Sequence, residues 1–251
     1  MKAFFTLLGR EVKSFFYTPI AYVVLFYFLF LTGYNFYLLI SAMNGYPTEV
    51  TVVEAFFAQA LFWFPFVLSF PLITMRVYSE EFRMGTIETL MTAPVTDWQI
   101  VMAKFFGVLV FYIVLWMPSF CCFASFQYIT SHTAANATGA YFGSYLMLLL
   151  LGMFYISIGN LASALTKDQI NAAVISFSTS TVLLFLGVLP EIMNLTSPAI
   201  KEIFSYISAV QHMSDFSKGL IDSRPIIWYL TMTALLSFIT FQVFQYRKWK
   251  S

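Results

Sequence analysis

Long apolar stretches without charged residues dominate the hydrophobic pattern of this 251-residue chain. Six of them contain no Asp, Glu, Lys, Arg or His, and each reaches the roughly 20 residues that a helix needs to cross a bilayer. They cover residues 20–40, 55–75, 105–129, 141–165, 170–189 and 226–246. The pattern therefore predicts an all-α integral membrane protein with six transmembrane helices, in a single domain over residues 1–251.

Composition indicates that the lipid bilayer is the solvent for most of the chain. Hydrophobic residues make up 60% of it and charged residues 10%, and the mean hydropathy is +0.79. A soluble domain normally carries about 25% charged residues. The net charge of +1 gives no sign of nucleic-acid binding. Cys121 and Cys122 are adjacent, which is sterically unsuited to a structural disulfide between them.

Lys and Arg residues are distributed unevenly between the two sides that six spans define. With the N-terminus in the cytoplasm, ten of the 13 basic residues lie on that side: Lys2, Arg10, Lys13, Arg76, Arg83, Lys104, Lys167, Arg247, Lys248 and Lys250. The acidic residues divide six to six, so the bias is specific to Lys and Arg. The positive-inside rule predicts that both termini are cytoplasmic and that the chain is a multi-pass protein of the plasma (inner) membrane.

Residues 1–18 alternate phenylalanine and leucine with charged side chains. This pattern predicts a short helix that lies on the cytoplasmic membrane surface, after which Pro19 turns the chain into the first span. A helical extension of that span is the alternative. Charges continue through Lys13 and no cleavage site follows promptly, so we expect no cleavable signal peptide.

The cytoplasmic segment 76–104 has strong helix-boundary signals. Its charged start continues the second span, and Gly85 is suited to end that helix in a left-handed conformation. Thr86 then caps a short helix, which Pro94 ends. One side of this helix is apolar and carries Ile87, Leu90 and Met91. Finally, Thr96 and Gln99 form the pattern of a capping box, so a further helix begins there and runs past Lys104 into the third span.

These residues resemble the ABC-2 type permease family. The matching positions are Glu80, Glu81, Gly85, Thr86, Glu88, Leu90, Pro94, Val95 and Lys104. The run 96–101 is most similar to the branch of gliding-motility and nitrous-oxide-reductase-maturation permeases. The resemblance implies that the short helix is a coupling helix that docks on a separate ABC ATPase subunit, through Glu81, Arg83, Gly85, Thr86, Ile87, Glu88, Leu90, Met91 and Pro94. A stable loop without a partner is the alternative.

The chain has no nucleotide-binding motif of its own. It contains no G-x-x-x-x-G-K-[ST] run and no Gly-Lys pair, so nucleotide must be bound by another polypeptide. We expect no catalytic site, no cofactor and no metal site, since His132 and His212 lie far apart without ligand-spaced partners.

Small and hydroxylated residues concentrate in the fourth and fifth spans. In the fifth span they either pack helices together or line a pathway at a dimer interface: Asn171, Ser176, Ser178, Thr179, Ser180 and Thr181. In the fourth span, packing is the preferred interpretation for Gly152, Ser157, Gly159, Asn160 and Ser163. We expect a homodimer or a paired permease.

The external loop 190–225 is predicted to contain an amphipathic helix, because its apolar residues recur at spacings of three and four. The resemblance implies re-entrant helices, whereas a helix resting on the outer surface is the alternative. An auxiliary extracytoplasmic subunit is a further candidate partner.

The sequence thus predicts the permease subunit of an ATP-driven exporter. A non-transporting complex that acts mechanically on a partner protein is an alternative that this subunit's sequence does not separate from export. A stand-alone carrier or channel and an intramembrane enzyme are disfavoured, because both usually need ionisable groups at membrane depth and the six spans have none.

Overall fold

The computed structural model describes residues 2–43, 50–86, 95–130, 138–193, 202 and 204–250. All regular elements of the described residues are helices. They are α1 (Lys2–Phe16), α2 (Pro19–Met43), α3 (Val52–Ala58), α4 (Ala60–Thr74), α5 (Ser79–Met84), α7 (Asp97–Ile129), α8 (Thr138–Leu165), α9 (Gln169–Ile192), α11 (Ala209–Ser217) and α12 (Ser223–Lys250).

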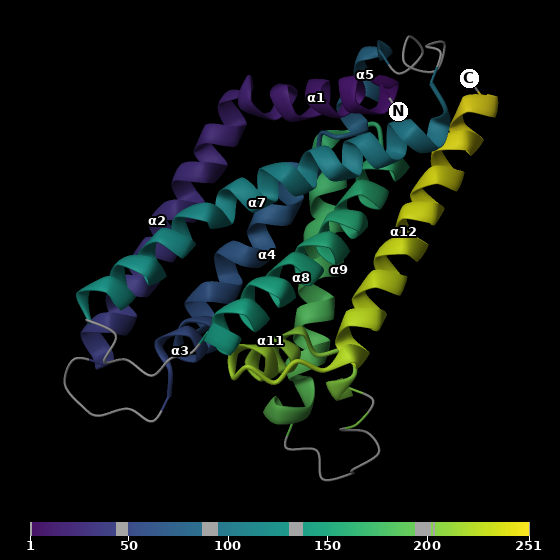
Figure 1. Cartoon of the computed structure of the whole chain (residues 1–251). Helices are drawn as coiled ribbons and strands as arrows, with labels where there is room; N and C mark the ends of the chain where they lie inside the picture. The colour runs from purple at the N-terminus through teal and green to yellow at the C-terminus, as the bar shows by residue number, and fades with distance from the viewer. Residues whose placement is uncertain are drawn as a thin grey trace.

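Six segments of the described residues are long and apolar enough to cross a membrane. They are Pro19–Met43, Ala60–Met84, Asp97–Ile129, Gly139–Leu165, Gln169–Pro190 and Ser223–Arg247. Each overlaps one predicted span, so the predicted all-α fold with six spans is confirmed. The helices run side by side between two ends of the molecule, and both termini lie at the same end (Figure 1).

The predicted start of the second span at residue 55 is wrong. Residues 52–58 form the separate helix α3, and the extended backbone of Gln59 (φ −72°, ψ 138°) divides it from α4. The hydroxyl of Thr51 caps α3 by accepting a hydrogen bond from the N–H of Glu54 at 3.2 Å. The run 55–75 contains no charged residue, so the criterion that defines the span does not mark a break at Gln59.

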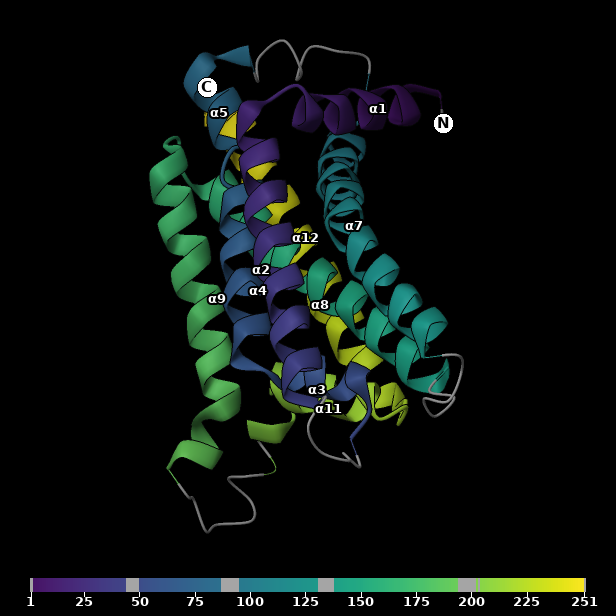
Figure 2. The same ribbon diagram turned by 90° about the vertical axis from the view of Figure 1, so that its left-hand side faces the viewer.

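The N-terminal helix α1 lies across one end of the bundle, not along it (Figures 1 and 2). It ends at Phe16, and the hydroxyl of Thr18 donates to the carbonyl oxygens of Ser14 and Phe15 at 2.7 and 3.0 Å before α2 begins. Phe15 stacks on Phe111 of α7 with the ring centroids 5.4 Å apart. The alternative of a continuous helical extension of the first span is therefore excluded.

Aromatic side chains fill the interior between α4, α7 and α8. Phe66 and Phe70 are one helical turn apart on α4, and their ring centroids are separated by 4.9 Å. Phe70 stacks on Tyr155 of α8 at 5.1 Å, and Phe66 lies 6.4 Å from Trp116 of α7. Buried residues make up 61–78% of the most apolar part of each of these three spans, but only 22–28% of that part in α2, α9 and α12. The latter three therefore present most of the apolar outer surface.

The end opposite α1 is closed by α3 and α11, which lie across it (Figure 2). Within the loop 190–225, the predicted amphipathic helix appears as α11, and it buries Met213 and Phe216. Gly143 of α8 allows this approach, since an added Cβ would lie 2.4 Å from the carbonyl oxygen of Phe216. Gly219, with φ +83°, follows α11 and leads toward α12.

Candidate functional site at the end that carries both termini

A break in the second span shapes this site. α4 ends at Thr74, residues 75–78 form turns, and α5 begins at Ser79. The buried hydroxyl of Ser163 on α8 accepts hydrogen bonds from the N–H groups of Tyr78 and Ser79 at 3.0 and 3.1 Å. It also donates to the carbonyl oxygen of Met75 at 3.0 Å. Backbone groups freed by a helix break need such partners, so Ser163 stabilises the turn that redirects the chain.

The helix α5 ends where the sequence predicts. Gly85 has φ +70° and ψ 3°, the left-handed conformation that closes a helix at low steric cost. The third span begins with the predicted capping box: the Thr96 hydroxyl accepts from the N–H of Gln99 at 3.4 Å, and the Gln99 side chain accepts from the N–H of Thr96 at 3.3 Å. Both flanks of residues 87–94 are therefore held by their own local signals.

Lys104 of α7 lies at the centre of the site, and its side chain is only 2% exposed. Its ammonium group lies 2.9 Å from a carboxylate oxygen of Glu81 and 3.5 Å from one of Glu11. It also donates to the carbonyl oxygen of Val77 at 2.9 Å. A buried charge is tolerated only when it is compensated in this way. Lys104 therefore ties α1, α5 and the turn between α4 and α5 to α7.

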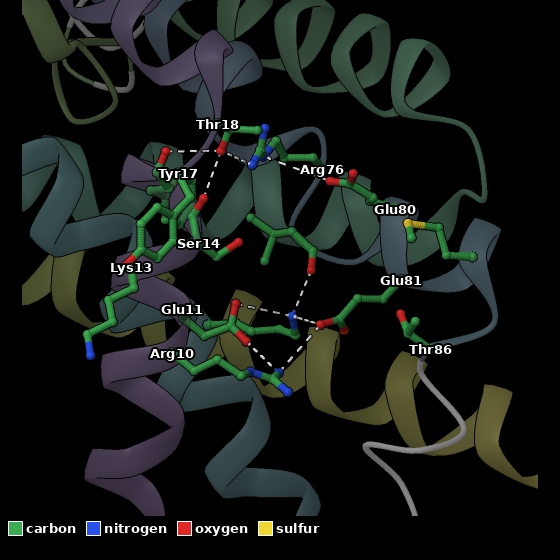
Figure 3. Close-up of a pocket in the computed structure, with 14 residues that line it drawn as sticks. Arg10, Glu11, Lys13, Ser14, Tyr17, Thr18, Arg76, Glu80, Glu81 and Thr86 are labelled. Atoms are coloured by element: carbon green, nitrogen blue, oxygen red, sulfur yellow. Dashed lines mark hydrogen bonds and ion pairs between the residues drawn. The ribbon is translucent and has the colours of Figure 1, made fainter.

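Arg10 completes this cluster from the solvent side. It lies 2.8 Å from Glu11 and 3.6 Å from Glu81 (Figure 3). Burial alone raises the pKa of the Glu11 carboxyl, but the charges of Lys104 and Arg10 outweigh it and hold this pKa below its ordinary value of 4.5. Two cations thus face two carboxylates. We call Arg10, Glu11, Glu81 and Lys104 the ion cluster.

A pocket of about 590 Å³ adjoins the ion cluster between α1, α5, α7 and the turns that follow α1 and α4. Arg76, at the end of the second span, forms part of its wall, and its guanidinium donates to the hydroxyl of Thr18 in the turn between α1 and α2. Figure 3 shows Thr18 and Arg76 facing each other across this wall, with Glu80 beside Arg76. The ion pair between Arg76 and Glu80 is long, at 3.9 Å.

The sequence comparisons agree with the six-span architecture. The profile of a family described as ABC-2 family transporter protein matches residues 40–244, which is more than half of the chain. The chain belongs to this family. A comparison with curated proteins gives no match. The protein is thus a multi-pass membrane protein and a permease component of an ABC transporter, in a family whose members generally pair with an ABC ATPase subunit.

The structure divides the predicted ATPase-binding residues of the permease into three sets. Glu81 belongs to the ion cluster and points inward, whereas Arg83, Gly85 and Thr86 are exposed at the end of α5. The remaining predicted residues lie outside the described part of the chain: Ile87, Glu88, Leu90, Met91 and Pro94. Glu81 therefore holds the start of the segment in place, and Thr86 also lines the pocket beside the ion cluster.

The polar residues of α9 are split between two faces. Ser176 and Ser180 are buried within the protomer, and Thr181 is half-buried. By contrast, Ser178 and Thr179 are exposed. Asn171, also exposed, donates to the carboxylate of Asp168 at 3.3 Å. The small residues of α8 pack closely, since an added Cβ on Gly159 would lie 2.1 Å from the hydroxyl of Thr74 and one on Gly152 would lie 2.3 Å from the ring of Tyr112.

Sequence reasoning did not find the ion cluster as a site. The sequence predicts Glu81 as an ATPase-binding residue and Lys104 as a position of the family resemblance, but it does not predict that they meet Arg10 and Glu11. A usable signal is that Lys104 stands directly before a 25-residue apolar run, where a cation needs a partner. The described residues contain no group of three or more His, Cys, Asp or Glu side chains arranged to hold a metal ion.

Proposed function

We propose that this permease is the membrane-spanning subunit of an exporter, in which a separate ATPase subunit docks on residues 86–94 and drives substrate translocation. The ion cluster is the observation that carries the proposal. It anchors α5, the helix directly before that segment, to α1 and α7 at once. A displacement of the docked segment would therefore move three helices together instead of deforming a loop.

Transmission of a movement requires contiguous packed elements with few soft joints. Residues 86–94 are connected to α4 through α5 and the turn that Ser163 holds, and to α7 directly along the chain. Lys104 joins these two routes at their base. We infer that the segment acts as a coupling helix, as its resemblance to the ABC-2 permeases implies, and that the chain is of the type found in the branch of gliding-motility and nitrous-oxide-reductase-maturation permeases.

The charges of the permease support one orientation in the membrane. The end that carries α1, α5 and the C-terminus (Figure 1) holds Arg10, Lys13, Arg76, Arg83 and Lys104. The opposite end holds Lys218 and Arg224 among the described residues. The positive-inside rule supports placing the first end in the cytoplasm, where an ATPase has access to nucleotide.

The translocation pathway is proposed to form between two copies of the chain. Aromatic rings in contact fill the space between α4, α7 and α8, whereas α2, α9 and α12 present largely exposed apolar faces. The exposed Ser178 and Thr179 place polar groups on such a face of α9. A cysteine at Ser178, in a chain lacking Cys121 and Cys122, should cross-link two copies, whereas one at the buried Ser176 should not. Equal cross-linking at both positions would contradict this arrangement.

Copurification of the ATPase tests the coupling assignment. Leu90→Asp would place an unpaired charge where an apolar pocket of the partner is expected, which costs several kcal/mol, on the order of 2–7 for an uncompensated polar group. We expect this variant to lose the ATPase and Glu88→Ala to retain most of it, because charges at the rim of an interface contribute less than buried anchors.

Leu220→Asp is the matched control for this experiment. Leu220 is exposed at the opposite end of the bundle, so this variant introduces the same charge away from the proposed contact. It should retain the ATPase fully, and all variants should reach the membrane equally. Retention of the ATPase by Leu90→Asp would show that residues 86–94 are not the docking segment.

A further inference from the structure

The side chains that line the pocket beside the ion cluster carry a net positive charge. Of its four cationic side chains, Arg10 and Lys104 are paired with Glu11 and Glu81. The remaining charged residues that line the pocket are Arg76, Lys13 and Glu80, which leave the pocket with a net positive charge.

Arg76 is the least exposed of these three residues. Its side chain is 11% exposed, which leaves little access to bulk water. Glu80 approaches only its Nε, at 3.9 Å, and the hydroxyl of Thr18 occupies Nη2. A guanidinium whose side chain is 11% exposed, with one long ion pair, one hydrogen bond and the centroid of the Phe15 ring 6.0 Å away, can still bind an anion, and its planar fork matches the oxygens of a phosphate.

Further polar groups line the same pocket on the side of α1. Ser14 and Tyr17 line the pocket, and Lys13 is exposed on α1, with no ion pair recorded for it among the described residues. Figure 3 shows Lys13 extending outward along α1, on the opposite side of the pocket from Arg76. The flexible side chain of Lys13 can therefore bind an anion at the opening of the pocket while Arg76 binds the same anion from inside.

The pocket adjoins the start of the first span, which favours the membrane as the source of the anion. It is bounded by the turn at residues 17–18, where the surface helix α1 meets the start of the first span. Tyr17 is exposed at this turn, in the position that tyrosine favours at the boundary between hydrocarbon and headgroups. Basic pockets at this depth suit the headgroups of anionic lipids.

We propose that this pocket binds the phosphate of an anionic phospholipid from the leaflet on the α1 side, with Arg76 as its main contact and Lys13 as a second. This site goes beyond the proposed function and does not depend on an ATPase. A bound lipid would hold α1 against the membrane surface and so hold Arg10 and Glu11 of the ion cluster in place.

Native mass spectrometry of the purified full chain tests the proposal. The chain is titrated with phosphatidylglycerol and with phosphatidylcholine of identical acyl chains, and the ratio of the two affinities is measured. Wild type should prefer phosphatidylglycerol. Arg76→Gln should lower this preference about fivefold, the effect of one basic residue near an anionic surface, and Lys13→Gln by up to the same factor. Arg76→Lys keeps the charge and should retain most of the preference.

Arg83→Gln is the matched control, since Arg83 is an exposed basic residue at the same end that does not line the pocket. It should leave the preference unchanged. If Arg83→Gln lowered the preference for phosphatidylglycerol as much as Arg76→Gln, diffuse surface charge would explain the preference and the proposal would be overturned. A wild type without any preference would overturn it as well. If Arg76→Gln fails to fold, Lys13→Gln compared with Arg83→Gln carries the same test. Displacement of the lipid by an equal concentration of inorganic phosphate would assign the pocket to a soluble phosphate and refute the lipid source.

Discussion

Replacing Lys104 with methionine keeps an unbranched side chain of similar length but removes the buried charge of the ion cluster. Glu11 and Glu81 would then face each other in a site where they are 13% and 21% exposed. Arg10 remains within 2.8 Å of Glu11, but it is 53% exposed and compensates only part of the remaining charge. Glu81 would lose a contact of 2.9 Å.

The expected cost follows from the burial of the carboxylates that remain. Removing one partner of a buried ion pair typically destabilises a protein by about 3–5 kcal/mol, because it leaves an uncompensated buried charge. We expect the lower end of this range for Lys104→Met, about 3 kcal/mol, because Arg10 stays in place. The triple variant Lys104→Met, Glu11→Gln, Glu81→Gln removes the stranded carboxylates as well. It should be more stable than Lys104→Met alone by at least about 1 kcal/mol.

Unfolding of the purified permease in mixed micelles by increasing denaturing detergent, followed by circular dichroism, measures these free energies. The single variants Glu11→Gln and Glu81→Gln are measured as well, so that the sum of the three single costs can be compared with the cost of the triple variant. Strong non-additivity is the predicted outcome, since all three side chains share one site. Costs that simply add across the three positions would refute the ion cluster as a coupled unit.

The pH dependence of the same measurement gives an independent check. The pKa of Glu11 is depressed below its ordinary 4.5 in the folded chain, although burial opposes the shift, because Lys104 and Arg10 are close. The stability from Glu11 is therefore fully present above pH 4.5 and is lost as the pH falls through the folded-state pKa. In Lys104→Met this acid-side loss should be smaller.

Three further predictions concern other parts of the permease. Gly159→Ala should cost about 1–3 kcal/mol in the same unfolding assay, because the added methyl would lie 2.1 Å from the Thr74 hydroxyl. The control Gly33→Ala, with nothing within 4 Å of the added methyl, should stay within about 0.5 kcal/mol of wild type. Equal costs would contradict the close packing of α8 on α4. Burial lowers the pKa of His212 below 6.5 against the opposing charges of nearby aspartates, so the folded chain resists protonation, and stability should fall as the pH drops below 6.5; a chain with His212→Gln that shows the same slope would exclude His212 as the cause. In a chain lacking Cys121 and Cys122, an impermeant thiol reagent should label a cysteine at residue 220 but not one at residue 84 in intact cells, and the reverse pattern would invert the orientation.

The spans of this permease were predictable because the bilayer imposes one strong constraint. A helix that crosses it must be apolar for about 20 residues, and a charge-free run of that length is visible without any knowledge of packing. The same uniformity hid the break at Gln59, since neither periodicity nor a charge marks it. Caps were predictable for a different reason: Gly85 and Thr96 act within a single helical turn, so their signals lie beside them in the sequence.

The ion cluster was beyond sequence reasoning because its members are distant along the chain. Glu11 and Lys104 are joined only when α1 folds back across the end of α7, and this fold-back depends on the turn at Thr18. Likewise, Ser163 looks like one of several small packing residues in α8 until the turn at residues 75–78 brings three backbone groups to its hydroxyl. The two faces of α9 also require the packed structure, because its polar residues are interleaved with apolar ones in the sequence.

Site-specific photo-cross-linking in intact cells tests the coupling assignment most directly. A photoreactive amino acid is placed at Leu90, or at Leu220 as a control at the opposite end, and the cross-linked chains are identified by peptide mass spectrometry. The proposed function predicts that Leu90, but not Leu220, captures a polypeptide that carries the G-x-x-x-x-G-K-[ST] nucleotide-binding motif. If Leu90 captures no such polypeptide while the variant permease remains active and membrane-inserted, the docking segment lies elsewhere and the coupling assignment is wrong.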